Sequence, residues 1–260
     1  MKFVRIDPPG QWCTHQAVKD AIRRCGGRTF LEVGCGAGHL SRLLCQGGLT
    51  GRGVDVSAAA VDEAREELKT FIDGGRFDVG LGDLFTLDGD GTGYDLALSL
   101  MVMEHIQDDL GFVNRMAHAV KPGGHVIICV PGRPDLWGIE DENVGHVRRY
   151  DRASLSDVLT RAGLRDVHVW SVAVPVANLL FRLGNAMIRL SGETTSKQTM
   201  SAQQQTEESG IRRIPFKTVF PPAFRLLLNG YTMAPLLALQ RLFYGSDLGL
   251  TLLAFGEKRA

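Results

Sequence analysis

Residues 29–39 read TFLEVGCGAGH and decide the fold. The first five are apolar or β-branched apart from Glu32, which is typical of a short buried strand. Three glycines follow at alternate positions, and a helix is expected to begin near His39. Such a strand, glycine turn and helix let a ligand approach the backbone closely, and the free amides at the helix start attract negative charge.

The details of this turn distinguish between two kinds of ligand. The dinucleotide-binding fingerprint G-x-G-x-x-G would place a glycine or alanine at position 39, where this chain has His39. Glu32 lies two residues before the first glycine. A carboxylate there would repel a pyrophosphate but suit a ligand that carries an ammonium or sulfonium cation. The turn therefore favours a cationic ligand over a dinucleotide.

Short apolar runs alternate with stretches of helical period from Thr29 to about Val130, which predicts βα units and a parallel sheet. One helix is expected from Ser57 to about Asp73, and another begins at Asp108. The expected strands are Thr29–Val33, Gly51–Asp55, Phe77–Leu81, Tyr94–Ser99, His125–Val130, Arg165–Ala173 and Leu250–Phe255.

Two further acids follow strands of this predicted sheet. Asp55 ends the second strand, 17 residues after Gly38, where a carboxylate can accept hydrogen bonds from both hydroxyls of a ribose. Asp83 follows the third strand and can accept a hydrogen bond from an adenine amino group. Because the carboxyl ends of parallel strands share one edge, Glu32, Asp55 and Asp83 are expected around one crevice.

Five motifs in register resemble those of class I S-adenosylmethionine-dependent methyltransferases of the small-molecule type, over roughly residues 25–170. The motifs are Leu31-Glu32-Val33-Gly34-Cys35-Gly36-Ala37-Gly38, Gly53-Val54-Asp55-Val56-Ser57, Gly82-Asp83-Leu84, Tyr94-Asp95 with Met103-Glu104-His105-Ile106, and Lys121-Pro122-Gly123-Gly124. The resemblance implies a Rossmann-like, doubly wound sheet of seven strands with an antiparallel last strand. It also implies that S-adenosylmethionine is the cofactor and lies across the carboxyl ends of the strands.

The same resemblance implies roles for single residues at this edge. The methionine part of the cofactor is bordered by the turn, the ribose is held by Asp55, the adenine is framed by the third strand, and the amino acid end passes the fourth. The cofactor-binding residues so assigned are Glu32, Gly34, Cys35, Gly36, Gly38, Asp55, Val56, Asp83, Leu84, Ser99 and Leu100.

Two histidines are candidate general bases, because imidazole titrates near neutral pH and can take a proton from a hydroxyl. His105 belongs to a Glu-His pair that resembles that of ubiquinone-type O-methyltransferases. Its alternative role is to cap the following helix or to hydrogen-bond within the cofactor loop. His146 is the second candidate. No metal is assigned, because the spacing matches neither an i, i+4 pair nor a facial triad.

The segment Pro131–Tyr150 is expected to face the acceptor. Its candidate substrate-binding residues are Trp137, Arg149 and Tyr150, with the last two orienting an acidic or phenolic group. The alternative is a loop in which the arginines pair with the acids at 140–142.

The residues after the fourth strand bear on the acceptor. Ser99-Leu100-Met101-Val102 stand where methyltransferases of exocyclic base amines or glutamine amides usually carry Asn/Asp-Pro-Pro-Tyr/Phe. We therefore predict methyl transfer to a small hydrophobic or phenolic acceptor, at oxygen, sulfur, nitrogen or carbon. The alternatives are a non-catalytic cofactor-binding or scaffold module and an NAD(P)-dependent oxidoreductase, the latter disfavoured by Glu32 and His39.

Two units are expected: a cofactor-binding domain of residues 1–173 with 249–260, and a helical insertion at 174–248 with a flexible loop at 192–210. The insertion is interpreted as a lid over the acceptor, or as a contact to a second copy of the chain or to the membrane surface. The 29 basic residues balance the 29 acidic ones, which gives no reason to expect nucleic-acid binding. The unpaired spacing of the five cysteines and the polar N-terminus predict a cytoplasmic chain.

Overall fold

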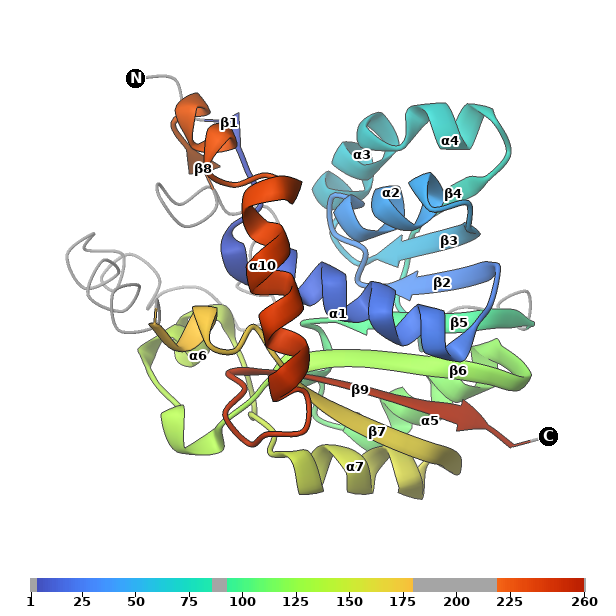
Figure 1. Ribbon diagram of the computed structural model, residues 1–260. Helices are drawn as coiled ribbons and strands as arrows, with labels where there is room; N and C mark the ends of the chain where they lie inside the picture. Colours follow the sequence, from blue (N-terminus) through green and yellow to red (C-terminus); the bar gives the residue numbers. More distant parts are fainter. Residues whose placement is uncertain (1–3, 86–92, 180–218, 260) are drawn as a thin grey trace.

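A sheet of seven strands, in the order β4-β3-β2-β5-β6-β9-β7, forms the centre of the computed structural model, which describes residues 4–85, 93–179 and 219–259 (Figure 1). β9 pairs antiparallel with both β6 and β7, whereas the other neighbours pair in parallel. The expected doubly wound α/β sheet with an antiparallel last strand is thus confirmed. The strands are β2 (Thr29–Val33), β3 (Thr50–Asp55), β4 (Phe77–Leu81), β5 (Tyr94–Leu100), β6 (Val120–Pro131), β7 (Leu164–Val172) and β9 (Thr251–Lys258).

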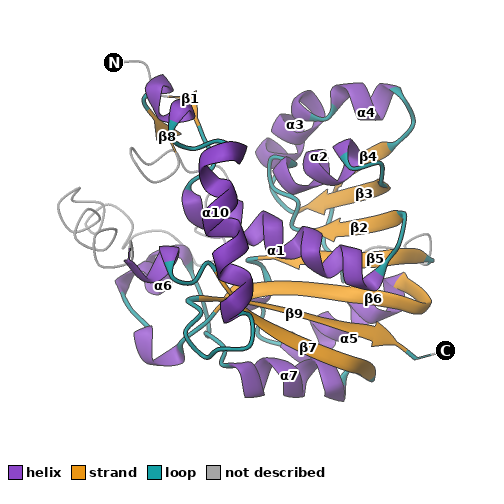
Figure 2. Ribbon diagram, viewed as in Figure 1, coloured by secondary structure: helices purple, strands orange, loops and turns teal. Residues whose placement is uncertain are grey.

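Helices cover both faces of the sheet (Figure 2), because successive residues of a strand point to opposite sides. Phe30 packs in a core with α1, α2 and α3, whereas its neighbour Leu31 packs in a second core with α5 and α7. The α-helices are α1 (Pro9–Cys25), α2 (His39–Gln46), α3 (Ala58–Glu67), α4 (Lys69–Asp73), α5 (Asp109–Ala119), α6 (Ile139–Val144), α7 (Arg152–Arg161) and α10 (Gly230–Gln240). Short 3-10 helices span Met103–His105, Pro134–Leu136, Pro222–Leu226 and Arg241–Phe243.

Three elements differ from the sequence prediction. α1 was not expected, although Cys13, Ala17 and Ala21 are buried at helical spacing. The helix after β3 starts at the predicted cap, but Leu68 interrupts it and divides it into α3 and α4. β6 begins at Val120, earlier than predicted, because the Lys-Pro-Gly-Gly stretch extends the strand after it ends α5.

The order of the strands determines where along the edge of the sheet a ligand is expected to bind. β2 and β5 are neighbours, and the α-helices that follow them, α2 and α5, pack on opposite faces of the sheet. This point, where the winding changes direction, is where open α/β sheets bind ligands, beyond the carboxyl ends of the strands. The glycine turn after β2 and the Met103–His105 helix after β5 therefore meet at the same edge.

The described part of the predicted insertion contacts the main domain through α10. The Gln240 side chain is completely buried, donates a hydrogen bond to the Cys13 carbonyl of α1 (3.0 Å) and accepts one from the Ala173 amide (3.2 Å). Val219–Phe220 (β8) pairs with Val4–Arg5 (β1). The loop 192–210 lies outside the described residues. The domain boundaries and the role of the insertion stay predictions.

A proline within the predicted helical insertion would suit the first turn of a helix, but Pro235 does not begin one. It lies inside α10, which starts at Gly230 because the Asn229 side chain accepts hydrogen bonds from the amides of Tyr231 and Thr232. The membrane or subunit contact predicted for the insertion at 174–248 stays a prediction, although five of its described large apolar side chains are more than half exposed. These are Leu179, Leu226, Leu227, Tyr231 and Leu242.

Among the described residues, no helix is both long enough and apolar enough to span a membrane. The five cysteines form no disulfide with one another, as expected.

Candidate active site

The glycine turn after β2 consists of residues in the left-handed region. Gly34, Gly36 and Gly38 have φ angles of 73°, 52° and 77°, which side chains disfavour. A Cβ on Gly34 would lie 2.3 Å from Val102 Cγ2, so the turn packs directly on the segment after β5. A Cβ on Gly36 would have no atom of the described residues within 4 Å. The backbone at Gly36 is therefore open to an incoming ligand.

An alanine is expected to reduce the stability of the protein more at Gly34 than at Gly36. Both variants suffer the left-handed strain of about 1–2 kcal/mol, but Gly34→Ala also overlaps Val102. Overpacking of this kind costs about 1–3 kcal/mol. We expect Gly34→Ala to lower the free energy of unfolding by that much more than Gly36→Ala, as measured by urea denaturation. Equal losses would contradict the packing of the turn on the β5 segment.

Glu32 lies beneath the turn, where its carboxyl group is almost completely buried at 3% exposure. Ser41 of α2 donates a hydrogen bond to its Oε2 at 2.5 Å. Burial raises the pKa of Glu32 to about 8, although the Ser41 hydrogen bonds oppose this. The carboxyl group therefore holds the start of α2 against β2, and its predicted contact with a cationic ligand stays a prediction. Cys35 is also buried, in the core beside Gly53.

Asp55 at the end of β3 ties the turn to the next βα connection. Its Oδ2 accepts a hydrogen bond from the Gly36 amide (2.8 Å) and its Oδ1 accepts one from the Ser57 amide (2.9 Å). Each carboxylate oxygen keeps a further lone pair for a ligand hydroxyl. The neighbouring Val56 is 51% exposed, as an apolar wall beside a ligand would be.

The residues predicted to frame an adenine follow β4. Asp83 is exposed, and its Oδ1 accepts a hydrogen bond from the Phe85 amide at 3.1 Å. Leu84 is buried in the core, so its side chain supports this segment from below. Leu81, which is not among the predicted cofactor-binding residues, is 60% exposed at the end of β4.

At the end of β5, the two predicted residues are less open. Ser99 is completely buried, and its hydroxyl has no hydrogen-bond partner among the residues that the structure describes. Leu100 is half-buried. The next residue, Met101, is exposed and has a φ of 57°, which turns the chain away from the sheet toward the 3-10 helix at Met103–His105.

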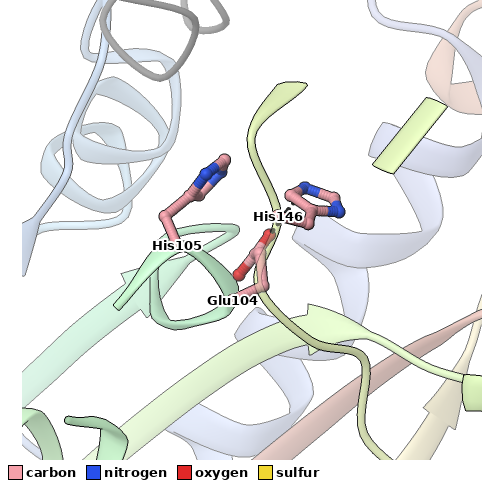
Figure 3. Close-up of side chains that lie close together, drawn as sticks. All are labelled: Glu104, His105 and His146. Atoms are coloured by element: carbon pink, nitrogen blue, oxygen red, sulfur yellow. Dashed lines mark ion pairs between the residues drawn. The ribbon is translucent and has the colours of Figure 1, made fainter. Parts of the chain in front are cut away.

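Glu104, His105 and His146 come together beside this turn, and we call them the Glu-His-His cluster (Figure 3). The two imidazole rings are 4.8 Å apart between centroids and meet edge to face. The His146 Nε2 lies 3.8 Å from Glu104 Oε1. A hydrogen bond from the Val147 amide to the Glu104 carbonyl, 2.8 Å long, joins the two chain segments. Sequence reasoning singled out both histidines but not the Glu104 carboxyl group.

Both histidines are held through Nδ1. The His105 Nδ1 lies 3.2 Å from the Gly145 carbonyl, and the His146 Nδ1 lies 2.8 Å from Asp141 Oδ1. A carbonyl or carboxylate oxygen can only accept, so these contacts place the N–H at Nδ1 and the lone pair at Nε2 of each neutral ring. The Gly145 contact joins His105 to the loop that carries His146, and the role of His105 as a base, a helix cap or a partner within the cofactor loop stays a prediction.

Burial sets the ionisation of this cluster. Burial and the nearby His146 lower the pKa of His105 to about 4, so its ring is neutral at physiological pH. Burial raises the pKa of Glu104 to about 8, and the Asp141 carboxylate adds to the shift. Burial alone would raise the pKa of Asp141, but hydrogen bonds from His146, Arg149 and the Gly138 amide lower it to about 2.

Two of the three predicted substrate-binding residues have internal partners instead. Arg149 is buried and donates to Asp141 Oδ1 (2.7 Å), and the Tyr150 hydroxyl is buried and donates to Asp109 (3.0 Å). These contacts fix the loop, and the assignment of Arg149 and Tyr150 to acceptor binding stays a prediction. The alternative of a salt-linked loop holds for Arg149. Trp137, at 41% exposure, remains available to an acceptor.

Comparison with known proteins places this geometry in a family. A family model described as a methyltransferase domain matches residues 14–169, from α1 to β7. The chain belongs to this family. The predicted class I S-adenosylmethionine-dependent methyltransferase is confirmed at the level of the family, and S-adenosylmethionine with it as the family's cofactor. Membership also favours a methyltransferase over the oxidoreductase alternative.

Two relatives illustrate the likeness in sequence. A probable S-adenosylmethionine-dependent methyltransferase of Mycolicibacterium smegmatis is 29% identical over 152 residues, 57% of each chain. A ubiquinone biosynthesis O-methyltransferase of Alkalilimnicola ehrlichii is 34% identical over 108 residues, which are 41% of this methyltransferase chain and 43% of that relative. The chain thus matches about half the length of these relatives.

Solved structures share the fold. A putative sarcosine dimethylglycine methyltransferase from Galdieria sulphuraria superposes with a TM-score of 0.60 at 14% identity, over 95% of this chain and 85% of that one. Phosphoethanolamine N-methyltransferase 2 of Haemonchus contortus, in complex with S-adenosylmethionine, gives 0.58 at 18% identity, over 95% of this chain and 52% of that one.

The carboxyl edge fits the family's cofactor. Gly36 leaves open space where any other residue would carry a Cβ, and the Asp55 carboxylate lies directly below with lone pairs to spare. Val56 and Leu81 expose apolar surface on either side, which suits the flat faces of an adenosine. These residues would hold the nucleoside, with its sulfur end toward β5.

Proposed function

We propose that this methyltransferase transfers a methyl group from S-adenosylmethionine to a hydroxyl oxygen of a small aromatic acceptor. The observation that carries the proposal is the Glu-His-His cluster, which the turn after β5 places beside the glycine loop. A phenolic hydroxyl is a poor nucleophile until it loses its proton, and buried imidazoles with a lone pair at Nε2 suit that task. S-adenosylmethionine supplies the methyl carbon on a sulfonium leaving group.

The protein's own residues position and activate the acceptor. Asp55 fixes the nucleoside, and the close contact of Gly34 with Val102 sets the distance from the glycine turn to the cluster. His146 would accept the proton of the hydroxyl, because the lowered pKa of His105 makes that ring a poor base. Asp141 keeps the N–H of His146 at Nδ1, so that the lone pair of the neutral ring is at Nε2, next to Glu104.

Two further observations support oxygen as the methylated atom and an aromatic acceptor. Ser99-Leu100-Met101-Val102 lack the Asn-Pro-Pro-Tyr type of motif associated with amine methylation. Relatives named as ubiquinone biosynthesis O-methyltransferases match 41% of the chain, which is consistent with a phenolic acceptor.

A transfer assay with labelled methyl tests this function. Protein is incubated with S-adenosylmethionine labelled in the methyl group and, in parallel, with a phenol, a catechol, a benzoate and a small primary amine. We expect label in an aryl methyl ether from the phenol or catechol, and none in the amine. Label in the amine would contradict O-methylation. Binding of S-adenosylhomocysteine without transfer to any acceptor would instead favour a cofactor-binding module.

A further inference from the structure

The Glu-His-His cluster brings three metal-binding side chains to one point. One ligand atom from each of Glu104, His105 and His146 lies within 4.8 Å of the others, and the Glu104–His146 pair is 3.8 Å apart. His105 and His146 are 41 residues apart in the chain, so no spacing in the sequence could indicate the cluster. Figure 3 shows Glu104 and His105 leaving the segment after β5 while His146 approaches from the loop after α6.

Glu104 supplies a second, independent sign of a missing ligand. Its side chain is completely buried, and neither carboxyl oxygen accepts a hydrogen bond from any residue that the structure describes. Buried polar atoms of proteins are almost always paired, and an unpaired carboxyl group is among the costliest exceptions. A cation between Glu104 and the two imidazoles would satisfy this carboxyl group directly.

The surrounding residues orient both imidazoles as they are oriented in metal sites. Metal-bound histidines usually donate the N–H of the second ring nitrogen to a carboxylate or a backbone carbonyl. Here His146 does so to Asp141, and His105 to the Gly145 carbonyl. Arg149 neutralises Asp141 at 2.7 Å, so the charge that faces an ion comes from Glu104.

The donor set determines the class of ion. Two imidazole nitrogens and one carboxylate suit a borderline divalent transition metal, and three protein ligands leave a coordination position for substrate. Donors around such an ion are about 3.4 Å apart at bond lengths near 2.1 Å. The ligand atoms of the cluster are farther apart, at 3.8 Å for the Glu104–His146 pair and within 4.8 Å for the whole set. Rotation of the side chains would bring them to the distance that a bound ion requires.

We propose that Glu104, His105 and His146 bind a divalent transition-metal ion such as Zn²⁺. The consequence for catalysis rests on the proposed function. The open position takes the acceptor hydroxyl oxygen, whose O–H proton passes to solvent. The oxygen then forms its bond to the methyl carbon with a lone pair, while the carbon–sulfur bond breaks and its electron pair stays on sulfur. In this arrangement the imidazoles are metal ligands in place of bases.

Cobalt spectroscopy tests the site without relying on turnover. Protein stripped with a chelator is titrated with Co²⁺, whose visible absorption reports nitrogen and oxygen ligands, and Zn²⁺ is then added in competition. We expect about one Co²⁺ per chain, displaced by Zn²⁺, with binding about 100-fold weaker in Glu104→Gln and in His105→Gln. His118→Ala, at an exposed position of α5, is the control and should leave binding unchanged.

Two results would overturn the metal site. One is no absorption band from the wild-type protein at about tenfold excess of Co²⁺. The other is a band that both cluster variants retain while circular dichroism shows them folded. If the metal-free protein transfers methyl groups at an unchanged rate, the ion has no role in catalysis, whereas the proposed O-methylation is not contradicted. Glu104-dependent Co²⁺ binding with no hydroxyl acceptor methylated would retain the ion and refute the proposed function.

Discussion

Asp55→Ala is expected to weaken the binding of S-adenosylhomocysteine by at least about 100-fold in a calorimetric titration. The variant loses two hydrogen bonds from ribose hydroxyls to a carboxylate, and hydrogen bonds to charged groups contribute about 1.5–3 kcal/mol each. It also releases the Gly36 amide, which Asp55 holds at 2.8 Å, so the turn is less well ordered for the ligand. Asp55→Asn keeps one acceptor and should be intermediate.

Asp62→Ala is the matched control, since Asp62 is an exposed acid of α3 that pairs with Arg65 at 3.0 Å. It removes the same charge from the same βα connection without touching the turn. If Asp55→Ala binds as tightly as the wild-type protein, Asp55 is not part of the binding site. If Asp55→Ala and Asp62→Ala both lose affinity by the same factor, net charge, and not a ribose contact, determines the affinity.

The stability of the metal-free protein is expected to fall steeply as the pH rises from about 6.5 to 8. Burial raises the pKa of both Glu32 and Glu104 from 4.5 to about 8. In this window the folded chain keeps two protons that the unfolded chain has released, so unfolding releases protons and becomes easier as pH rises. Each carboxyl group contributes a slope of up to about 1.4 kcal/mol per pH unit.

Above about pH 6.5 the buried histidines contribute little to the pH dependence of stability. Burial lowers the pKa of His15 and His105 from 6.5 to about 4, which makes the unfolded chain bind more protons below pH 6.5 and opposes the glutamate effect there. Urea denaturation with a chelator present measures the slope. Glu32→Gln should roughly halve it, and Glu66→Gln, at an exposed position of α3, should not. A flat profile in the wild-type protein would contradict the burial of neutral carboxyl groups.

The strands were predictable from the sequence because each is a short apolar run that both faces of the sheet bury. Phe30 and Leu31 alternate between the two cores, and this alternation keeps the register of β2. The helix α1 was also predictable in principle, since its buried residues recur every fourth position. Pro235 shows the opposite case: a residue that usually begins a helix lies inside one because the cap at Asn229 decides where it starts.

The Glu-His-His cluster could be predicted only in part. His105 and His146 stood out as titratable side chains near strand ends, but their meeting depends on the backbone contact between Val147 and Glu104, which no local pattern encodes. Arg149 was predicted to bind the acceptor because an arginine beside a predicted active site suits an acidic or phenolic group. Its actual partner, Asp141, is eight residues away, within the same loop.

A crystal structure with S-adenosylhomocysteine bound would show whether the cofactor lies over the glycine turn. We expect the ribose hydroxyls within hydrogen-bond distance of the Asp55 carboxylate, the amino acid tail over Gly36, and the sulfur facing Glu104, His105 and His146. A ligand at another edge of the sheet, or a sulfur directed away from those three side chains, would contradict this placement.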